Sequence, residues 1–237
     1  VGFGGGVMAG VAHAETEFVF ILNPDAFPAP GAEDALIRAA ARYPDADILV
    51  PRIEDEAGAP FFRHEASWEP RARRREAPMG DFCAPMFSGA ALFVRRDLFI
   101  ARGGFDTAFF LFYEDDDLAL RRWNARTPAV MIADALVRHE GDASSAGSPR
   151  ARRIKDVSFG WSRVHAMRKH GAGGVAAMLV GMALKLPVYL ASGRWARLGR
   201  QWRRLHGAAL RLSGRPAPFR APDALDRAAK AAGVPTL

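Results

Sequence analysis

Short apolar runs alternate with an amphipathic stretch in the first part of the chain. Residues 17–22 (EFVFIL) and 47–53 (DILVPRI) are rich in aromatic and β-branched residues, which favours two buried strands. Between them, residues 33–43 (EDALIRAAARY) begin with acids, as the first turn of a helix often does. This alternation of strand and helix predicts an α/β fold with a parallel sheet.

Two further apolar runs extend this pattern. Residues 88–96 (SGAALFVRR) combine a glycine turn with a strand, and a short helix and the turn at 103–106 are expected to follow. Residues 130–137 (VMIADALV) predict another strand. The arginine-rich residues 63–81 contain Pro70 and Pro78 and predict a long surface loop.

Polar residues follow two of the predicted strands. Asn23-Pro24-Asp25 comes after the strand at 17–22, and His139 comes after the strand at 130–137. Ligands of such sheets bind at the carboxyl ends of the strands. Carboxylate and imidazole groups, together with phosphate oxygens, can hold a divalent cation, so Asp25 and His139 are candidate metal ligands. A purely structural histidine is the alternative for His139.

Four adjacent acids, Glu114 to Asp117, follow an aromatic run at 109–113 and precede a helical stretch at 118–123. One interpretation is N-capping, since the helix dipole offsets about 0.3–1 kcal/mol of the repulsion per charge. The other interpretation is catalytic. A carboxylate held against the aromatic wall takes up a proton as a general base, while its neighbours orient substrate hydroxyls.

Charge divides the chain more sharply than the net value of +7 suggests. Residues 1–149 carry 15 basic and 23 acidic residues, and residues 150–215 carry 15 basic residues and one acid. We therefore expect a globular catalytic core at 1–149, a helical basic region at 150–215 and a loosely ordered tail at 216–237. The single cysteine, Cys83, and the lack of a signal peptide at the start favour a reducing, cytoplasmic setting.

The basic region has the pattern of amphipathic helices. Apolar residues recur at three- and four-residue spacing through 150–170, and the apolar run 171–191 contains glycines, Lys185 and Pro187, which favours an interfacial segment over a membrane span. From Arg194 onward, tryptophans and leucines share one face and arginines crowd the rest. Such a helix lies flat on an anionic membrane surface. Nucleic-acid binding is the alternative, but no nucleic-acid-binding motif is found and the aromatics form one stripe, so we expect no nucleic-acid partner.

The chain opens on the glycine-rich segment VGFGGGVMAG. Gly4, Gly6 and Ala9 fit the spacing of a dinucleotide-binding motif, but that motif requires a preceding strand to aim the turn. We therefore expect an isolated glycine loop.

Taken in order, these motifs resemble glycosyltransferase family 2, in particular its rhamnosyltransferase-like branch. The matching segments cover about residues 1–171 and are GFGGG at 2–6, NPD at 23–25, the glycine strand with RR at 89–96, GGFD at 103–106, the aromatic and acidic stretch at 109–118, and HEGDASS at 139–145. The resemblance implies a GT-A fold, a Rossmann-like, mostly parallel sheet flanked by helices, here with a C-terminal amphipathic helical appendage. Because the glycine loop is internal in the family, the chain is expected to lack the first strands, which hold the nucleotide base.

The resemblance also implies a reaction. A sugar, with rhamnose as a candidate, would pass with inversion from a nucleotide-diphosphate donor to a hydroxyl of a glycan or lipid-linked acceptor in cell-surface polysaccharide synthesis. The enzyme would work in the cytoplasm, peripherally on the inner face of the cell membrane. A non-catalytic remnant or binding module that keeps only the acceptor half is the alternative.

The resemblance assigns roles to individual residues. Asp25 and His139 would hold Mg²⁺ or Mn²⁺, and Asp115 would be the general base. Contacts to the substrates would come from Gly5, Gly6, Asn23, Gly89, Glu114 and Asp117.

Overall fold

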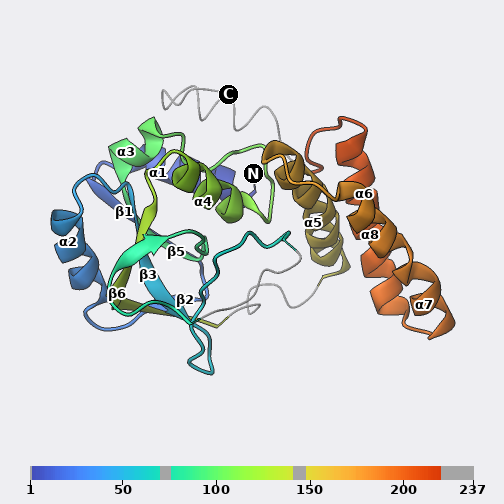
Figure 1. Ribbon diagram of the computed structural model, residues 1–237, viewed down its shortest axis with the longest axis horizontal. Helices are drawn as coiled ribbons and strands as arrows, with labels where there is room; N and C mark the ends of the chain where they lie inside the picture. Colours follow the sequence, from blue (N-terminus) through green and yellow to red (C-terminus); the bar gives the residue numbers. More distant parts are fainter. Residues whose placement is uncertain (1, 70–75, 141–147, 220–237) are drawn as a thin grey trace. The chain divides into compact units, whose positions relative to one another are not determined.

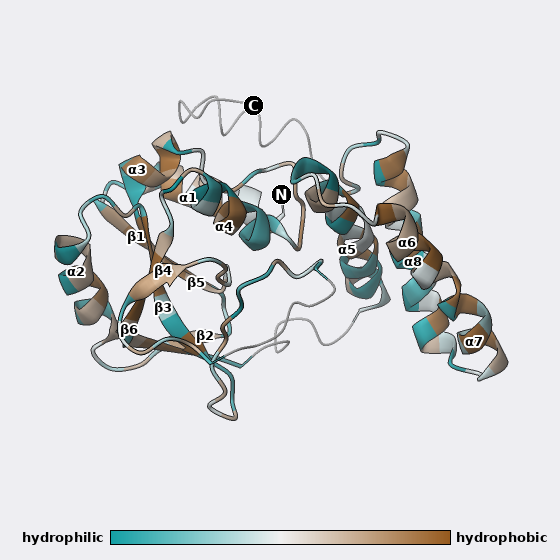
Figure 2. Ribbon diagram, in the orientation of Figure 1, coloured by the Kyte–Doolittle hydropathy of each residue, from teal (hydrophilic) through white to brown (hydrophobic). Residues whose placement is uncertain are grey.

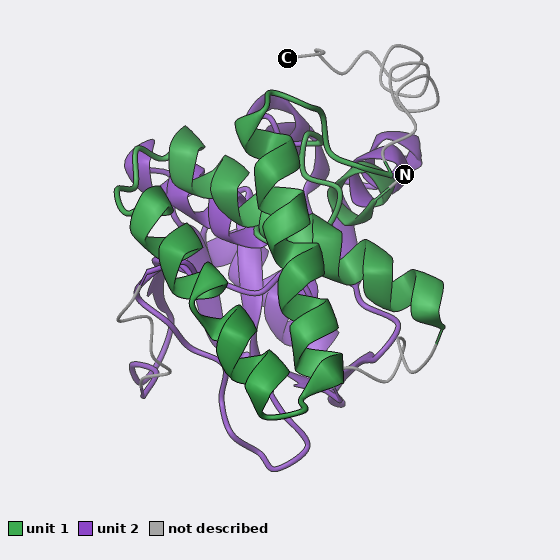
Figure 3. Cartoon of the chain, turned by 90° about the vertical axis from the view of Figure 1, so that its right-hand side faces the viewer, with its two compact units in different colours: residues 1–6, 107–113, 147–225 green, residues 7–106, 114–146, 226–237 purple. Residues whose placement is uncertain are grey.

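The computed structural model describes residues 2–69, 76–140 and 148–219 (Figure 1). The chain forms two compact units, which Figure 3 shows in different colours. We call them the sheet unit, with residues 7–106, 114–146 and 226–237, and the helical unit, with residues 1–6, 107–113 and 147–225.

The sheet unit is built on a six-stranded sheet. The strands lie in the order β1 (Phe18–Leu22), β5 (Ala91–Arg95), β3 (Ile48–Glu54), β6 (Ala129–His139) and β2 (Ala26–Pro28), and β4 (Phe82–Ala84) also pairs with β6. The predicted α/β class is confirmed. The sheet is mixed rather than mostly parallel, because β3 and β6 run parallel while the other described pairs are antiparallel. An apolar run indicates burial, but it does not fix the direction of the neighbouring strand.

Helices α2 (Ala32–Arg42), α3 (Arg96–Ala101) and α4 (Glu114–Asn124) accompany the sheet (Figure 1). The apolar face of α2 forms a core with β3 and β6, in which Leu36 and Ile132 are completely buried. A second core cluster contains Ala26 of β2, Ala91 of β5 and Val137 of β6. The sequence therefore places its strands and α2 correctly to within one to three residues.

The glycine-rich start of the chain differs from the expected loop, because it forms helix α1 (Phe3–His13). Each glycine inside a helix costs about 1 kcal/mol relative to alanine, so tertiary contacts must support the helix. Met8 and Val11 are buried, and the Arg96 side chain donates hydrogen bonds to the carbonyl oxygens of Val11 and Ala12 at 3.2 and 3.1 Å. These contacts satisfy carbonyls that the end of a helix leaves without an internal partner.

The helical unit contains α5 (Pro149–Lys169), α6 (Val175–Ala183), α7 (Lys185–Ala191) and α8 (Trp195–Leu212). The predicted helices at 150–170 and after Arg194 are both present. The apolar run 171–191 is divided between α6 and α7. Within the described ranges, none of the helices combines the length and hydropathy that crossing a membrane requires.

Helix α8 packs closely on α5. A Cβ atom at Gly160 of α5 would overlap the carbonyl oxygen of Arg204, and one at Gly207 of α8 would overlap that of Val157. Asp156 of α5 forms an ion pair with Arg203 at 2.8 Å. The single acid of residues 150–215 thus lies against α8, although the excess of arginines on this helix favoured a membrane surface over packing within the protein.

Arg204 also lies 3.7 Å from the Asp156 carboxylate, and Arg211 donates a 2.9 Å hydrogen bond to His165 Nδ1. Three arginines of α8 are therefore engaged by α5.

Residues 220–237 lie outside the described residues, so the loosely ordered tail stays a prediction.

Candidate active site

One edge of the sheet gathers the polar residues that follow its strands. Leu22 at the end of β1 pairs with Ala91 at the start of β5, and the Asn23 N–H donates a 2.8 Å hydrogen bond to the Ala90 carbonyl. On the far side of β3, Ala26 of β2 pairs with His139, the last residue of β6. The turn at 23–25 thus links β1 to β2 at the edge where β3 and β6 also end.

This turn places Asp25 beside His139. The His139 Nε2 atom lies 3.2 Å from Asp25 Oδ1, and the Asp25 side chain is only 9% exposed. The two candidate ligands from separate strand ends are therefore neighbours. Among the described residues, no cluster of three histidine, cysteine or acidic side chains is suited to a metal ion. Two protein donors fit a cation that takes its remaining ligands from phosphates and water.

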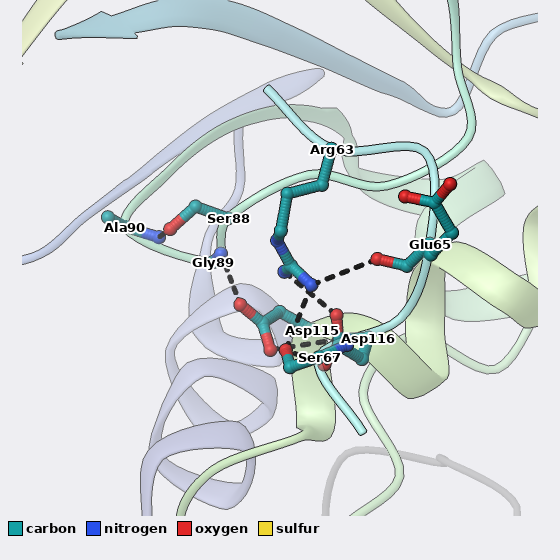
Figure 4. Close-up of polar contacts among 8 residues, drawn as sticks. All are labelled: Arg63, Glu65, Ser67, Ser88, Gly89, Ala90, Asp115 and Asp116. Carbon is teal, nitrogen blue, oxygen red and sulfur yellow. Dashed lines mark hydrogen bonds and ion pairs between the residues drawn. The ribbon is translucent and has the colours of Figure 1, made fainter. Parts of the chain in front are cut away.

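The four acids form the first turn of α4, at the same edge of the sheet as Gly89. The half-buried Asp115 accepts two backbone hydrogen bonds, from the N–H of Gly89 at 3.2 Å and from the N–H of Asp116 at 2.9 Å (Figure 4). These contacts fix the carboxylate at the N-terminus of the helix.

Asp116 is completely buried, and the charge of its carboxylate is compensated by a segment that is distant in the sequence. Arg63 Nη2 lies 2.9 Å from its Oδ1 atom, and Ser67 donates hydrogen bonds to Oδ2 from its backbone N–H at 3.1 Å and from its hydroxyl (Figure 4). Arg63 and Ser67 belong to the expected surface loop. This part of the loop is packed instead: Trp68 within it and Phe62 directly before it are buried, and these two aromatic residues were the available signal for it.

Asp117 has a partner on its own helix. Its carboxylate is buried and lies 2.9 Å from Arg121 Nε, and Arg121 also donates a 2.6 Å hydrogen bond to the Gly104 carbonyl. This arrangement holds α4 against the turn at 103–106. The acid cluster therefore contains carboxylates with different surroundings.

Glu114 and Asp115 are the two acids with altered proton affinity. Burial, assisted by the charge of Asp115, raises the pKa of Glu114 to about 8. Burial and the neighbouring Asp116 charge raise the pKa of Asp115 to about 6, although Arg63 and the two N–H donors act in the opposite direction. At pH 7, Glu114 keeps its proton, whereas Asp115 is mostly ionised and able to accept one.

The aromatic run before the acids has an unusual backbone. Phe112 and Tyr113 have φ angles of 71° and 66°. This is a left-handed backbone conformation that residues other than glycine rarely adopt. Within the helical unit, their rings lie 5.7 and 5.3 Å from the ring of Phe159 on α5. These two strained residues directly precede Glu114, the first residue of α4.

The remaining predicted site residues lie in two places. Asn23 and Gly89 are at the sheet edge. Gly89 also lies next to the acids, since its N–H contacts Asp115. Gly5 and Gly6 are part of helix α1. Ser144 and Ser145 of the last motif lie outside the described residues.

Residues 1–103 match the model of Glycosyl transferase family 2, so the resemblance found in the sequence is confirmed and this segment carries a domain of that family. The GT-A fold is also confirmed. The crystal structure of GalNAc-T7 with UDP, GalNAc and Mn²⁺ has a TM-score of 0.51 and 15% identity to this chain, covering 69% of it and 37% of that chain.

Two curated relatives come from Mycobacterium tuberculosis, strains CDC 1551 / Oshkosh and ATCC 25618 / H37Rv. Each is an N-acetylglucosaminyl-diphospho-decaprenol L-rhamnosyltransferase with 31% identity over 166 residues, covering 61% of this chain and 54% of the relative. The chain thus spans about half the length of the curated relatives it matches.

Proposed function

We propose that this chain is the catalytic part of an inverting glycosyltransferase. It transfers a sugar from a nucleotide-diphosphate donor to a hydroxyl of a glycan or lipid-linked acceptor in the synthesis of cell-surface polysaccharide. Rhamnose is the first candidate for this sugar. The family match and the two rhamnosyltransferase relatives support this proposal. The observation that carries it is the Asp115 carboxylate, fixed at the sheet edge with a pKa of about 6.

Asp115 is the general base of this reaction. Its carboxylate takes the proton of the acceptor hydroxyl as that oxygen bonds to the anomeric carbon, while the bond from this carbon to the diphosphate oxygen breaks on the opposite face. Such an attack from the face opposite to the diphosphate inverts the configuration of the anomeric carbon. The N–H groups of Gly89 and Asp116 orient the carboxylate, and the Arg63 and Ser67 contacts occupy Asp116, which leaves Asp115 for the substrate.

Asp25 and His139 are the residues that would hold Mg²⁺ or Mn²⁺ together with the donor diphosphate. A divalent cation supplies charge neutralisation for the leaving diphosphate. The neighbour with the same fold was crystallised with UDP and Mn²⁺, which supports this assignment. Substrate contacts by Gly5, Gly6, Asn23, Gly89, Glu114 and Asp117 are part of the proposal.

We also propose that the helical unit brings this activity to the membrane. Residues 150–215 carry a large excess of basic residues, which suits the anionic inner face of a cell membrane in the cytoplasm. A lipid-linked acceptor would be presented at that surface.

The test is sugar transfer by the protein carrying Asp115→Asn. With dTDP-rhamnose and a polyprenyl-diphosphate-linked N-acetylglucosamine acceptor, we expect the transfer rate to fall about 10²- to 10⁴-fold. Asp97→Asn changes an exposed acid in the first turn of α3 and should leave the rate unchanged. Full activity of Asp115→Asn would refute the base assignment. Acceptor binding without any transfer by the unmodified protein would favour the binding-module alternative.

A further inference from the structure

Helices α6 to α8 expose a large apolar surface. In Figure 2 brown residues recur along these three helices. The exposed large apolar side chains on them are Val180, Leu184, Val188, Leu190, Trp195, Trp202 and Leu212. Trp195 and Trp202 of α8 are 66% and 65% exposed, which is unusual for the largest apolar side chain. An apolar surface of this kind marks an interaction site.

The packing of α8 explains why its apolar side is left open. Gly207 and the Arg204 backbone approach α5 so closely that α8 must present this side to α5. Arg203 and Arg211 are drawn to the same side by Asp156 and His165. The polar side of this amphipathic helix therefore faces α5, and the tryptophan side faces away from α5.

A groove of about 510 Å³ lies between α6 and α8. It is lined by Leu179, Val180 and Ala183 of α6 and by Trp202, Leu205, His206, Ala209 and Leu212 of α8. The volume is within the range of about 300–1,000 Å³ that is usual for small-molecule sites. Apart from the His206 ring and the Trp202 N–H, the lining side chains offer no polar atoms, so the groove suits a hydrocarbon rather than a sugar or a nucleotide.

The charge of the segment that forms the groove indicates which headgroup a hydrocarbon ligand would carry. Residues 171–215 contain no aspartate or glutamate and eight arginines and lysines. Three of these arginines are exposed: Arg194 directly precedes α8, and Arg197 and Arg200 lie in its first half. Arginine pairs well with phosphate oxygens, and tryptophan favours the headgroup region of a bilayer.

We propose that this groove binds one hydrocarbon chain of an anionic bilayer lipid, whose phosphate is held by the exposed arginines of α8. The groove is lined by residues of the helical unit alone, and none of them is a candidate active-site residue, so this proposal does not depend on the transferase assignment. It adds to membrane attachment a defined site that takes a single chain out of the lipid layer.

The first experiment measures binding of 11-(dansylamino)undecanoate, an anionic single-chain probe, by its fluorescence. Ala183→Phe places a ring in the groove, and we expect it to weaken probe binding at least about tenfold, the loss for two excluded methylene groups. Ala176→Phe makes the same change at an exposed position of α6 outside the groove lining and should not weaken binding. Equal binding by the two variants, or no binding by the unmodified protein, would overturn the proposal.

A second experiment tests the headgroup. Phosphatidylglycerol vesicles should displace the probe, and phosphatidylcholine vesicles should displace it less. Replacing Arg194, Arg197 and Arg200 together by glutamine should remove this difference. Equal displacement by both vesicles would overturn the phosphate assignment. Retention on a DNA duplex without probe binding, or a dimer that only Ala183→Phe dissociates, would assign the surface to nucleic acid or to a second copy instead.

Discussion

The backbone N–H of Gly89 points at the carboxylate of Asp115, with 3.2 Å between the nitrogen and Oδ2. Gly89 precedes strand β5, and Asp115 lies in the first turn of α4, 26 positions later in the sequence. This hydrogen bond connects the sheet edge with the proposed general base. It favours the ionised carboxylate and so limits the rise in its pKa that burial causes.

The first prediction concerns the pH dependence of transfer. Because the base must be ionised, and the pKa of Asp115 is raised to about 6, we expect kcat/KM to fall as the pH drops below about 6. Rates measured from pH 5 to 8 would show a decline of about tenfold per pH unit on the acidic side. The residual rate of Asp115→Asn should lack this decline, and an identical profile in the variant would contradict the assignment.

The second prediction concerns the pH dependence of stability. Glu114 has a pKa of about 8 in the folded protein and near its ordinary value of 4.5 when unfolded. Between these values the folded state binds one more proton, so the free energy of unfolding decreases as the pH rises. Glu114→Gln is neutral throughout and should reduce this decrease, most visibly in melting temperatures between pH 6.5 and 8.

Glu33→Gln is the matched control for this measurement, since Glu33 is an exposed acid in the first turn of α2. It should keep the pH dependence of the unmodified protein. If Glu114→Gln also keeps it, Glu114 does not hold a proton at neutral pH.

The third prediction concerns the Arg63–Asp116 ion pair. Removing the arginine leaves a buried carboxylate without its charged partner, so Arg63→Ala should lower the free energy of unfolding by about 3–5 kcal/mol. The Arg52–Glu54 pair is more exposed, and Arg52→Ala should cost at most about 1 kcal/mol. Urea denaturation measures both. Equal losses would mean that the Arg63 pair contributes no more than a surface pair.

The fourth prediction concerns metal binding. In the presence of UDP, we expect Asp25→Ala and His139→Ala each to weaken Mn²⁺ binding at least about tenfold, as measured by electron paramagnetic resonance of free Mn²⁺. Asp34→Ala, at an exposed position of α2, should not change it. This measurement requires no activity. Unchanged Mn²⁺ affinity in both variants would remove Asp25 and His139 from the metal site.

The fifth prediction concerns the contact between α5 and α8. A methyl group at Gly160 has no room beside the Arg204 carbonyl, so Gly160→Ala should destabilise the protein by about 1–3 kcal/mol. At Gly181 of α6 a Cβ would meet nothing within 4 Å, and Gly181→Ala should stabilise by about 0.4–1 kcal/mol. Thermal unfolding should therefore give shifts of opposite sign for the two variants, and shifts of the same sign would contradict this prediction.

The sequence predicts those parts of the structure that depend on local pattern. The first-turn acids and the apolar face of α2 come from one short stretch of sequence. The tryptophans and leucines of α8 come from another. The neighbourhood of Asp25 and His139 was also predicted, because both follow strands of one sheet. By contrast, the five glycines at the start suggested a loop, whereas burial of Met8 and Val11 and the contacts from Arg96 stabilise a helix.

Contacts between distant segments could not be predicted in this way. No spacing rule connects Arg63 with Asp116, which are 53 positions apart, and no periodicity shows that Asp156 faces Arg203. The sheet directions escaped prediction for the same reason, since each depends on a partner strand elsewhere in the chain.

The Arg63–Asp116 ion pair also has a consequence for how the protein folds. The segment between these residues contains β4, β5 and α3, so the pair forms by closing a long loop around them. Closing such a loop is slower than forming a helix or a hairpin, and its entropic cost precedes its reward. During synthesis, Asp116 is added 53 residues after Arg63. The Asp116 carboxylate therefore gains its charged partner only once that long loop has closed, and the surroundings of the neighbouring Asp115 are completed late in folding.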